Sequence, residues 1–223
     1  MTWRFWHHNV TIVNMSASGS SPSIPAPQGY HHGDLQRALV LAARGLVDSG
    51  GAAALTLRAA AQLAGVSATA PYRHFADRTA LLAAVLTEGF HDLQTALAAA
   101  RTAQSDPVAA YLAVGRAYIG FADTHQHLYR LMFGLECNKL MYPTLLAAGQ
   151  AAFSEVLQAA TACEAEGLTG SRSAADVALA GWAVVHGIAA LHVDGILNVV
   201  TPHTLPEATD ALLGILVEGI APR

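Results

Sequence analysis

The sequence has 223 residues, enough for one large domain or for a small domain followed by a larger one. A composition of 53% hydrophobic and 13% charged residues excludes a charge-dense disordered chain. Alanine and leucine supply most of the apolar share, which favours helices over strands. The net charge of −4 excludes a uniformly basic protein, but residues 1–80 carry six Lys and Arg against three acids, while residues 81–223 carry six against thirteen. This asymmetry fits an N-terminal part that contacts DNA and an acidic body that DNA would repel.

Cysteine use and hydropathy favour a cytoplasmic protein. The two cysteines, Cys137 and Cys163, are far apart and lack metal-ligand spacing, which is typical of a reducing compartment. The longest strongly apolar stretch, Val177–Val193, contains His186 and His192 and falls short of a membrane span. We therefore expect a buried helix there and no membrane partner.

The first 28 residues differ in composition from the rest. Ser16–Gln28 is rich in serine, proline and alanine and has no helical period, and the residues before it lack the apolar core of a signal peptide. We expect residues 1–28 to form a disordered tail.

A helical period starts at Gly33 and predicts a first helix. Gly50 and Gly51 predict its end, because glycine readily adopts the left-handed conformation of a C-cap. The apolar residues of its buried face are Leu35, Leu39, Ala42, Ala43, Leu46 and Val47.

Two short helices joined by a glycine turn come next. Thr56 predicts the N-cap of a second helix, which Gly65 ends. Ser67 is predicted to cap a third helix, Ala68–His74. Together they predict a helix-turn-helix over residues 56–75.

The remaining chain is also predicted to be helical. Asp77 caps a long fourth helix, Asp106-Pro107 starts another, and Ser173 with Asp176 resembles a capping box. The buried stripe of the fourth helix is Leu81, Leu82, Val85, Phe90, Leu93 and Leu97. The helices that follow are expected at about 107–124, 126–134, 142–166, 173–197 and 205–220.

These elements predict an all-α fold of about nine helices without strands. A three-helix helix-turn-helix domain, residues 29–77, is expected to bind DNA. A larger helical domain, residues 78–223, is expected to bind a ligand and to dimerise.

The segment Thr56–Leu86 resembles the N-terminal domain of the TetR family of bacterial regulators, and agreement extends over about fifty residues from Gly33 onward. The matching elements are Ala64-Gly65-Val66-Ser67, Tyr72-Arg73-His74-Phe75, Asp77-Arg78 and Leu81-Leu82. The resemblance implies a dimeric transcriptional regulator that binds double-stranded operator DNA.

A recognition helix presents its N-terminal residues to base edges in the major groove. The residues expected to face the bases are Ser67, Ala68, Thr69 and Ala70. The resemblance implies phosphate contacts from Tyr72, His74 and Arg78, the last in place of the usual lysine. Thr56 is a cap that could also reach a phosphate, and Arg73 is either a DNA contact or a solvated charge. We expect Phe75 to lie in the core.

Pro71 departs from the commonest family pattern. Proline costs little in the first turn of a helix, where few hydrogen bonds are lost. We therefore expect the recognition helix to form, with Pro71 affecting its local geometry.

The C-terminal part resembles one class of TetR C-terminal domains through its Trp-His-Gly signature, Trp182–Leu191, and through His125–Phe133. Trp182 and His186 share a helix face, and Gly187 permits close approach of a neighbouring helix.

In the family this part binds a small effector and forms the dimer. The residues expected to line the effector pocket, each also compatible with plain core packing, are Phe90, Tyr118, Phe121, Met132, Phe133, Trp182 and His186. The homodimer is expected to form through Val177–Leu197 and Leu205–Ile220, because two recognition helices must meet grooves about 34–36 Å apart. The stripe on the last helix is Leu205, Ala208, Leu212, Ile215, Leu216 and Gly219.

Two other functions stay open. An enzyme would need a catalytic motif, and none of the common ones occurs, so we expect no catalytic residue, metal or cofactor. A helical adaptor that kept the fold without binding DNA is the second alternative. Our preferred hypothesis is a repressor that an effector releases from its operator by shifting the spacing of the recognition helices, although an activator is also compatible with the sequence.

Overall fold

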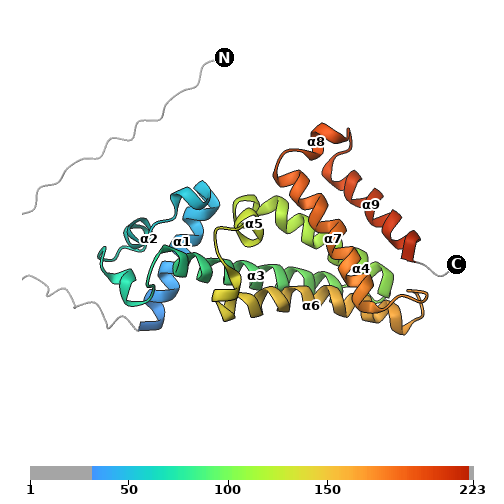
Figure 1. Ribbon diagram of the computed structural model, residues 1–223, viewed down its shortest axis with the longest axis horizontal. Helices are drawn as coiled ribbons and strands as arrows, with labels where there is room; N and C mark the ends of the chain where they lie inside the picture. Colours follow the sequence, from blue (N-terminus) through green and yellow to red (C-terminus); the bar gives the residue numbers. More distant parts are fainter. Residues whose placement is uncertain (1–31, 221–223) are drawn as a thin grey trace, which may run out of the picture. The chain divides into compact units, whose positions relative to one another are not determined.

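The computed structural model describes residues 32–220, and all regular elements in that range are helical (Figure 1). The all-α prediction is therefore confirmed for these residues, and the expected tail, residues 1–28, lies outside them. The α-helices are α1 (His32–Ala54), α2 (Leu57–Leu63), α3 (Arg78–Thr102), α4 (Pro107–Thr124), α5 (Gln126–Phe133), α6 (Pro143–Ala165), α7 (Ala174–Val193), α8 (Leu197–Val200) and α9 (Leu205–Ile220). Two 3-10 turns complete them, η1 (Ala70–Arg73) and η2 (Lys139–Met141).

Four of the five predicted N-caps are confirmed. The side chains of Thr56, Asp77, Asp106 and Ser173 each accept a hydrogen bond from the backbone N–H three residues later, at N–O distances of 2.7–3.1 Å. Each bond satisfies a donor that the first helical turn would leave free. These local signals set the starts of α2, α3, α4 and α7.

The predicted glycine stops are also confirmed. Gly51 breaks the helical conformation near the end of α1 with φ 63°, and Gly65 follows α2 with φ 69°. Positive φ at these positions favours glycine, which has no Cβ to clash with the backbone.

The predicted third helix, Ala68–His74, is wrong as an α-helix. The segment forms turns that lead into η1, with a bond from the Ala70 N–H to the Ser67 carbonyl at 3.0 Å. In an α-helix the Ser67 carbonyl would accept from residue 71, but Pro71 has no N–H. The predicted Ser67 cap is wrong too, because its hydroxyl pairs with the Thr69 hydroxyl at 3.2 Å.

The helix predicted at 173–197 ends earlier than expected. It stops at Val193, Gly195 adopts φ 72°, and α8 is separate. The resulting α7 is nevertheless long and apolar enough to cross a membrane by length and composition alone, contrary to the sequence estimate. The prediction that it packs within the protein is confirmed in part, because one face is buried against α4, α6 and α9 while the other is open.

The core continues from one end of α3 to the other. The N-terminal half of α3 packs on α1, and the helix also packs on α4, α5 and α6. Its predicted stripe is fully buried: Leu81, Leu82, Val85, Phe90, Leu93 and Leu97. One helix therefore runs from the helix-turn-helix region into the larger helical body, while the domain boundary at residue 77 stays a prediction.

Candidate nucleic-acid interface and ligand cavity

The turn after α2 presents polar side chains to solvent. Ser67, Thr69 and Arg73 are exposed, as is Ala68, and Thr56 at the N-cap before α2 is exposed too. The Gly65 N–H donates to the Gln62 carbonyl and the Val66 N–H to the Ala61 carbonyl, which fixes the path of the turn.

The segment is anchored by its apolar residues. Pro71 and Phe75 are buried, the latter as predicted, while the Tyr72 side chain between them is 62% exposed. Ala70 and His74 are half-buried. Burial of Pro71 and Phe75, four positions apart, thus leaves the Tyr72 and Arg73 side chains pointing to solvent, as the predicted DNA contacts require.

Arg78 has a structural role that the sequence did not indicate. Its Nε donates to the Leu55 carbonyl at 2.8 Å and its Nη2 donates to the Ala52 carbonyl. One guanidinium therefore bonds to two carbonyls at the C-terminal end of α1, and the Ala52 carbonyl also accepts from the Leu55 N–H at 3.2 Å. The predicted phosphate contact of Arg78 is untested and competes with this role.

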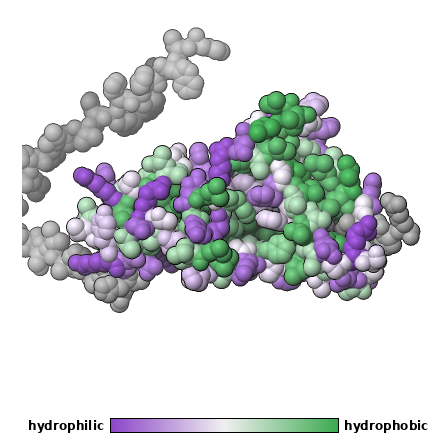
Figure 2. All heavy atoms as spheres, in the orientation of Figure 1, coloured by the Kyte–Doolittle hydropathy of each residue, from purple (hydrophilic) through white to green (hydrophobic). Residues whose placement is uncertain are grey.

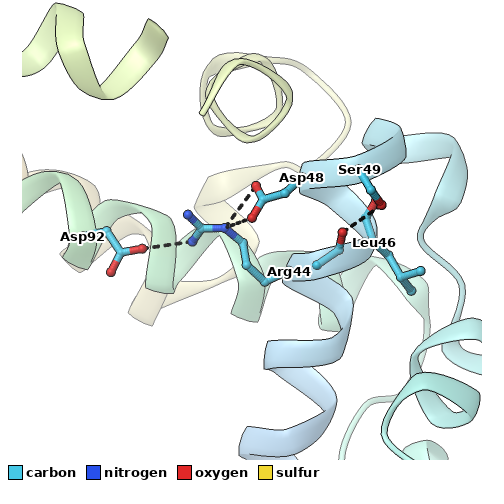
Figure 3. A network of polar contacts seen from close by, with 6 residues as sticks. Arg44, Leu46, Asp48, Ser49 and Asp92 are labelled. Atoms are coloured by element: carbon cyan, nitrogen blue, oxygen red, sulfur yellow. Dashed lines mark hydrogen bonds and ion pairs between the residues drawn. The ribbon is translucent and has the colours of Figure 1, made fainter. Parts of the chain in front are cut away.

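A second arginine ties α1 to α3 (Figure 3). The Arg44 guanidinium reaches Asp92 on α3 at 3.0 Å and Asp48 on α1 at 3.1 Å. In the same view the Ser49 hydroxyl donates to the carbonyls of Gly45 and Leu46, at 2.8 and 3.2 Å. Arg44 and Arg78 therefore connect the helix-turn-helix region to α3 at two separate points.

The larger helical body holds an apolar cavity of about 390 Å³. Its walls come mainly from α3, α6 and α7, and its volume is within the range of small-molecule sites. The lining residues are Phe90, Leu93, Leu97, Tyr118, Phe133, Lys139, Leu145, Leu146, Gly149, Gln150, Ala152, Phe153, Val156, Leu179 and Trp182.

The structure brings four of the seven predicted pocket residues to this cavity: Phe90, Tyr118, Phe133 and Trp182. The other three do not line it. Met132 and Phe121 are buried in the core, the latter with its ring 4.8 Å from that of His125, and His186 lies behind the cavity wall.

His186 belongs to a polar cluster within this aromatic wall. Its Nδ1 lies 2.9 Å from the Tyr118 hydroxyl and 2.8 Å from the Tyr129 hydroxyl, and its ring stacks on Trp182 at 5.2 Å. Burial lowers the pKa of His186 and raises the pKa of Tyr129 to about 12, so the neutral forms are favoured. The two tyrosine hydroxyls share this one imidazole nitrogen, so the Tyr118 hydroxyl has its hydrogen-bond partners inside the wall.

Sequence analysis missed the contribution of α6 to the cavity. Leu145, Gly149, Ala152, Phe153 and Val156 recur at helical spacing and all line it. The periodicity was visible, but it could not tell which neighbouring helix this face would meet. Gln150 on α6 and Lys139 on η2 were missed too, because the sequence did not show which segments meet at the cavity.

The face formed by α7, α8 and α9 exposes apolar side chains (Figure 2). Ile215 is 65% exposed and Val199 is 82% exposed. The predicted α9 stripe is divided: Ala208 is buried within the chain, Leu205 and Leu216 are half-buried, and Leu212, Ile215 and Gly219 are exposed. Gly187 has no atom within 4 Å of the position that a Cβ would take, so the close approach expected there does not occur within the chain.

In the part of the chain that the structure describes, no group of three or more His, Cys, Asp or Glu side chains is placed to hold a metal ion.

Two family comparisons match the two parts of the chain. Residues 39–85 match the family described as "Bacterial regulatory proteins, tetR family", and residues 111–218 match "Tetracyclin repressor-like, C-terminal domain". A comparison with curated proteins found no match.

Solved structures share the fold. A protein of unknown function from Rhodococcus sp. RHA1 is 35% identical, with a TM-score of 0.77 over 87% of this chain and 99% of its own. A TetR family transcription regulator from Marinobacter aquaeolei VT8 is 16% identical, with a TM-score of 0.64 over 85% of this chain and 96% of its own. The superantigen PfiT is 17% identical, with a TM-score of 0.64 over 81% of this chain and 95% of its own. At such identities the last two show the fold alone.

Proposed function

The chain belongs to the TetR family and is a DNA-binding transcriptional regulator, and from this premise we propose that it is a homodimeric repressor released from its operator by a small molecule. The finer resemblance to the Trp-His-Gly class is part of this proposal. Its support is the stacked pair of Trp182 and His186 beside the cavity.

The observation that carries the DNA-binding site is the exposure of residues 67–73 around a buried anchor. Thr69 and Tyr72 project from a segment that Pro71 and Phe75 hold against the core. We assign base contacts to Ser67, Ala68, Thr69 and Ala70, and phosphate contacts to Thr56, Tyr72, Arg73 and His74. A short turn in place of a full recognition helix still offers these side chains at its N-terminal end.

The dimer is proposed to form through α7 and α9. Their open face combines small residues, such as Ala183 and Gly187, with the exposed Leu212 and Ile215. Small residues allow two helices to approach closely, and the larger apolar side chains gain free energy on burial. Two operator half-sites also require two protomers that are related by a two-fold axis.

The cavity is proposed to bind the effector. Phe90, Leu93 and Leu97 line it from α3, the same helix whose first turn is tied to α1 by Arg78. A ligand that favours another position of α3 would therefore change the spacing of the two DNA-binding segments. Because linkage is reciprocal, operator DNA must weaken effector binding by the same factor.

DNA binding is tested by Tyr72→Ala, with Arg116→Gln as a control on the exposed surface of α4. We expect Tyr72→Ala to weaken binding to the upstream region of the protein's own gene at least tenfold in fluorescence anisotropy, because a charge-neutral phosphate contact is lost from each protomer. Arg116→Gln should bind as the wild type does. Unchanged affinity of a folded Tyr72→Ala dimer would overturn the assignment.

The dimer is tested by Ile215→Glu, with Leu41→Glu as a control because Leu41 is 62% exposed on α1. Ile215→Glu should give a monomer in analytical ultracentrifugation, since the carboxylate would be buried opposite its own copy. Leu41→Glu should stay a dimer. If the Ile215→Glu protein remains a dimer, the dimer interface lies elsewhere on the protein.

A further inference from the structure

The cation at the edge of the cavity suggests what kind of molecule the cavity binds. Lys139, the only lysine in the sequence, is half-buried in η2 and lines the cavity. Its Nζ donates to the Gly134 carbonyl at 2.9 Å, and no carboxylate of the described residues lies within 4.0 Å of it. By contrast, Arg44 and Arg101 each pair with an acid.

A half-buried ammonium without an anion is costly, because part of its hydration is lost and no opposite charge replaces it. The ammonium has three donors, and one of them serves the Gly134 carbonyl. An anionic group of a ligand would supply the opposite charge and accept hydrogen bonds from the remaining N–H donors of Lys139.

The deep part of the cavity, away from Lys139 and Gln150, offers no free polar partner. Leu93, Leu97, Leu145 and Val156 are buried and purely apolar. The Tyr118 hydroxyl is already bonded to His186 Nδ1 at 2.9 Å. A polar group placed deep in the cavity would lose its water without gaining a free partner.

The exposed members of the lining mark the opening. Leu146, Gln150 and Leu179 are exposed, and Lys139 lies with them at the boundary between apolar wall and solvent. A ligand would thus insert its apolar part and leave its head at Lys139, where the Gln150 amide could add a hydrogen bond.

We infer that the effector is an amphiphile with an apolar body and a single carboxylate head that pairs with Lys139. This inference rests on the proposed function, because it assumes that the cavity is the effector site. A cationic head would be repelled there, and a neutral head would gain only an ordinary hydrogen bond.

Decanoate and decylammonium below their critical micelle concentrations, and decan-1-ol below its solubility limit, test the inference by titration calorimetry on the full-length dimer. We expect decanoate to bind about tenfold more tightly than decan-1-ol, and decylammonium to bind most weakly. Lys139→Met keeps most of the apolar side chain without its charge and should remove the preference, whereas Lys139→Arg should keep it.

Gly149→Leu tests whether the probe molecules bind inside this cavity. A Cβ at Gly149 would lie 3.8 Å from the Phe90 ring, so the larger side chain should fill cavity space, and circular dichroism checks the fold. We expect it to weaken both decanoate and decan-1-ol.

The outcomes separate the two proposals. Equal binding of decanoate and decan-1-ol, or a preference that survives Lys139→Met, would overturn the carboxylate inference and leave the effector cavity standing. Absence of binding by all three probes, or binding unaffected by Gly149→Leu, would overturn both.

Discussion

Arg73 and Arg78 lie five positions apart, yet the structure predicts opposite consequences for their loss. Arg73 is exposed within the proposed DNA-binding segment, residues 67–73, whereas Arg78 is half-buried and bonded to the carbonyls of Ala52 and Leu55. We compare Arg73→Gln with Arg78→Gln, since glutamine removes the charge from each while keeping a polar side chain.

The expected changes in the salt dependence of DNA binding and in the free energy of unfolding follow from these contacts. A phosphate contact contributes about −0.9 to the slope of log K against log salt, and a dimer carries Arg73 twice, so Arg73→Gln should make the slope less steep by about 1.8. This amounts to about tenfold in the salt-induced loss of affinity between roughly 50 and 200 mM salt. Arg78→Gln should leave the slope unchanged and cost about 2 kcal/mol of folding free energy, because charged hydrogen bonds to two carbonyls are lost.

The assays are salt titrations of operator binding by fluorescence anisotropy and urea unfolding of the same proteins. Arg116→Gln is the control for removing an exposed arginine; it should leave the salt slope unchanged, and its solvent-exposed ion pair with Asp210 at 2.8 Å should contribute less than about 1 kcal/mol to stability. An unchanged salt slope for Arg73→Gln would refute the assignment of Arg73 to a phosphate. A reduced slope with full stability for Arg78→Gln would show that Arg78 contacts DNA instead of supporting α1.

Three further predictions concern the body. Glu155 is 5% exposed and accepts from two nitrogens of Arg101 at 2.9 and 3.0 Å, so Arg101→Met should cost about 3 kcal/mol in urea unfolding and the Arg101→Met, Glu155→Met double variant should cost less, because no charge is left buried. Gly181→Ala should lower the free energy of unfolding by about 1–3 kcal/mol in the same assay, since its methyl group would overlap the buried Tyr111 hydroxyl. Gly120→Ala, which has open space around it, should leave that free energy unchanged. Burial lowers the pKa of His186, so the unfolded state binds the proton more readily and stability falls as pH drops below about 6.5; His186→Gln should reduce the difference in unfolding free energy between about pH 7.5 and about pH 5.5. Equal costs for the single and double variants, a stable Gly181→Ala protein or an unchanged pH dependence would each contradict the corresponding reasoning.

Signals that act within a few residues were sufficient to predict four of the five N-caps and the glycine breaks at Gly51 and Gly65, but not the end of α7. Thr56 and Asp106 bond to N–H groups three positions away, and Gly51 interrupts α1 near its end through its own φ. Such features depend little on the rest of the fold, so the sequence contains them in full.

Features that depend on distant partners were predicted less well. Arg78 bonds to carbonyls 23 and 26 residues earlier, which no spacing rule reveals. The cavity needs the α6 face around Gly149 to meet α3, and helix-helix pairing was not determined by periodicity. The error at Pro71 had a local cause: in so short a segment, one missing N–H was enough to prevent a regular α-helix.

The continuity of α3 has a mechanical consequence. From Leu93 at the cavity to Arg78 beside the DNA-binding segment, the helix rises about 22 Å. A tilt of about 5° around the cavity would therefore swing its first turn sideways by about 2 Å, a length estimated from the same helical rise. Hydrogen bonds to base edges tolerate only a few tenths of an ångström, so a change too small to alter the packing of the core would already misalign the protein with its groove.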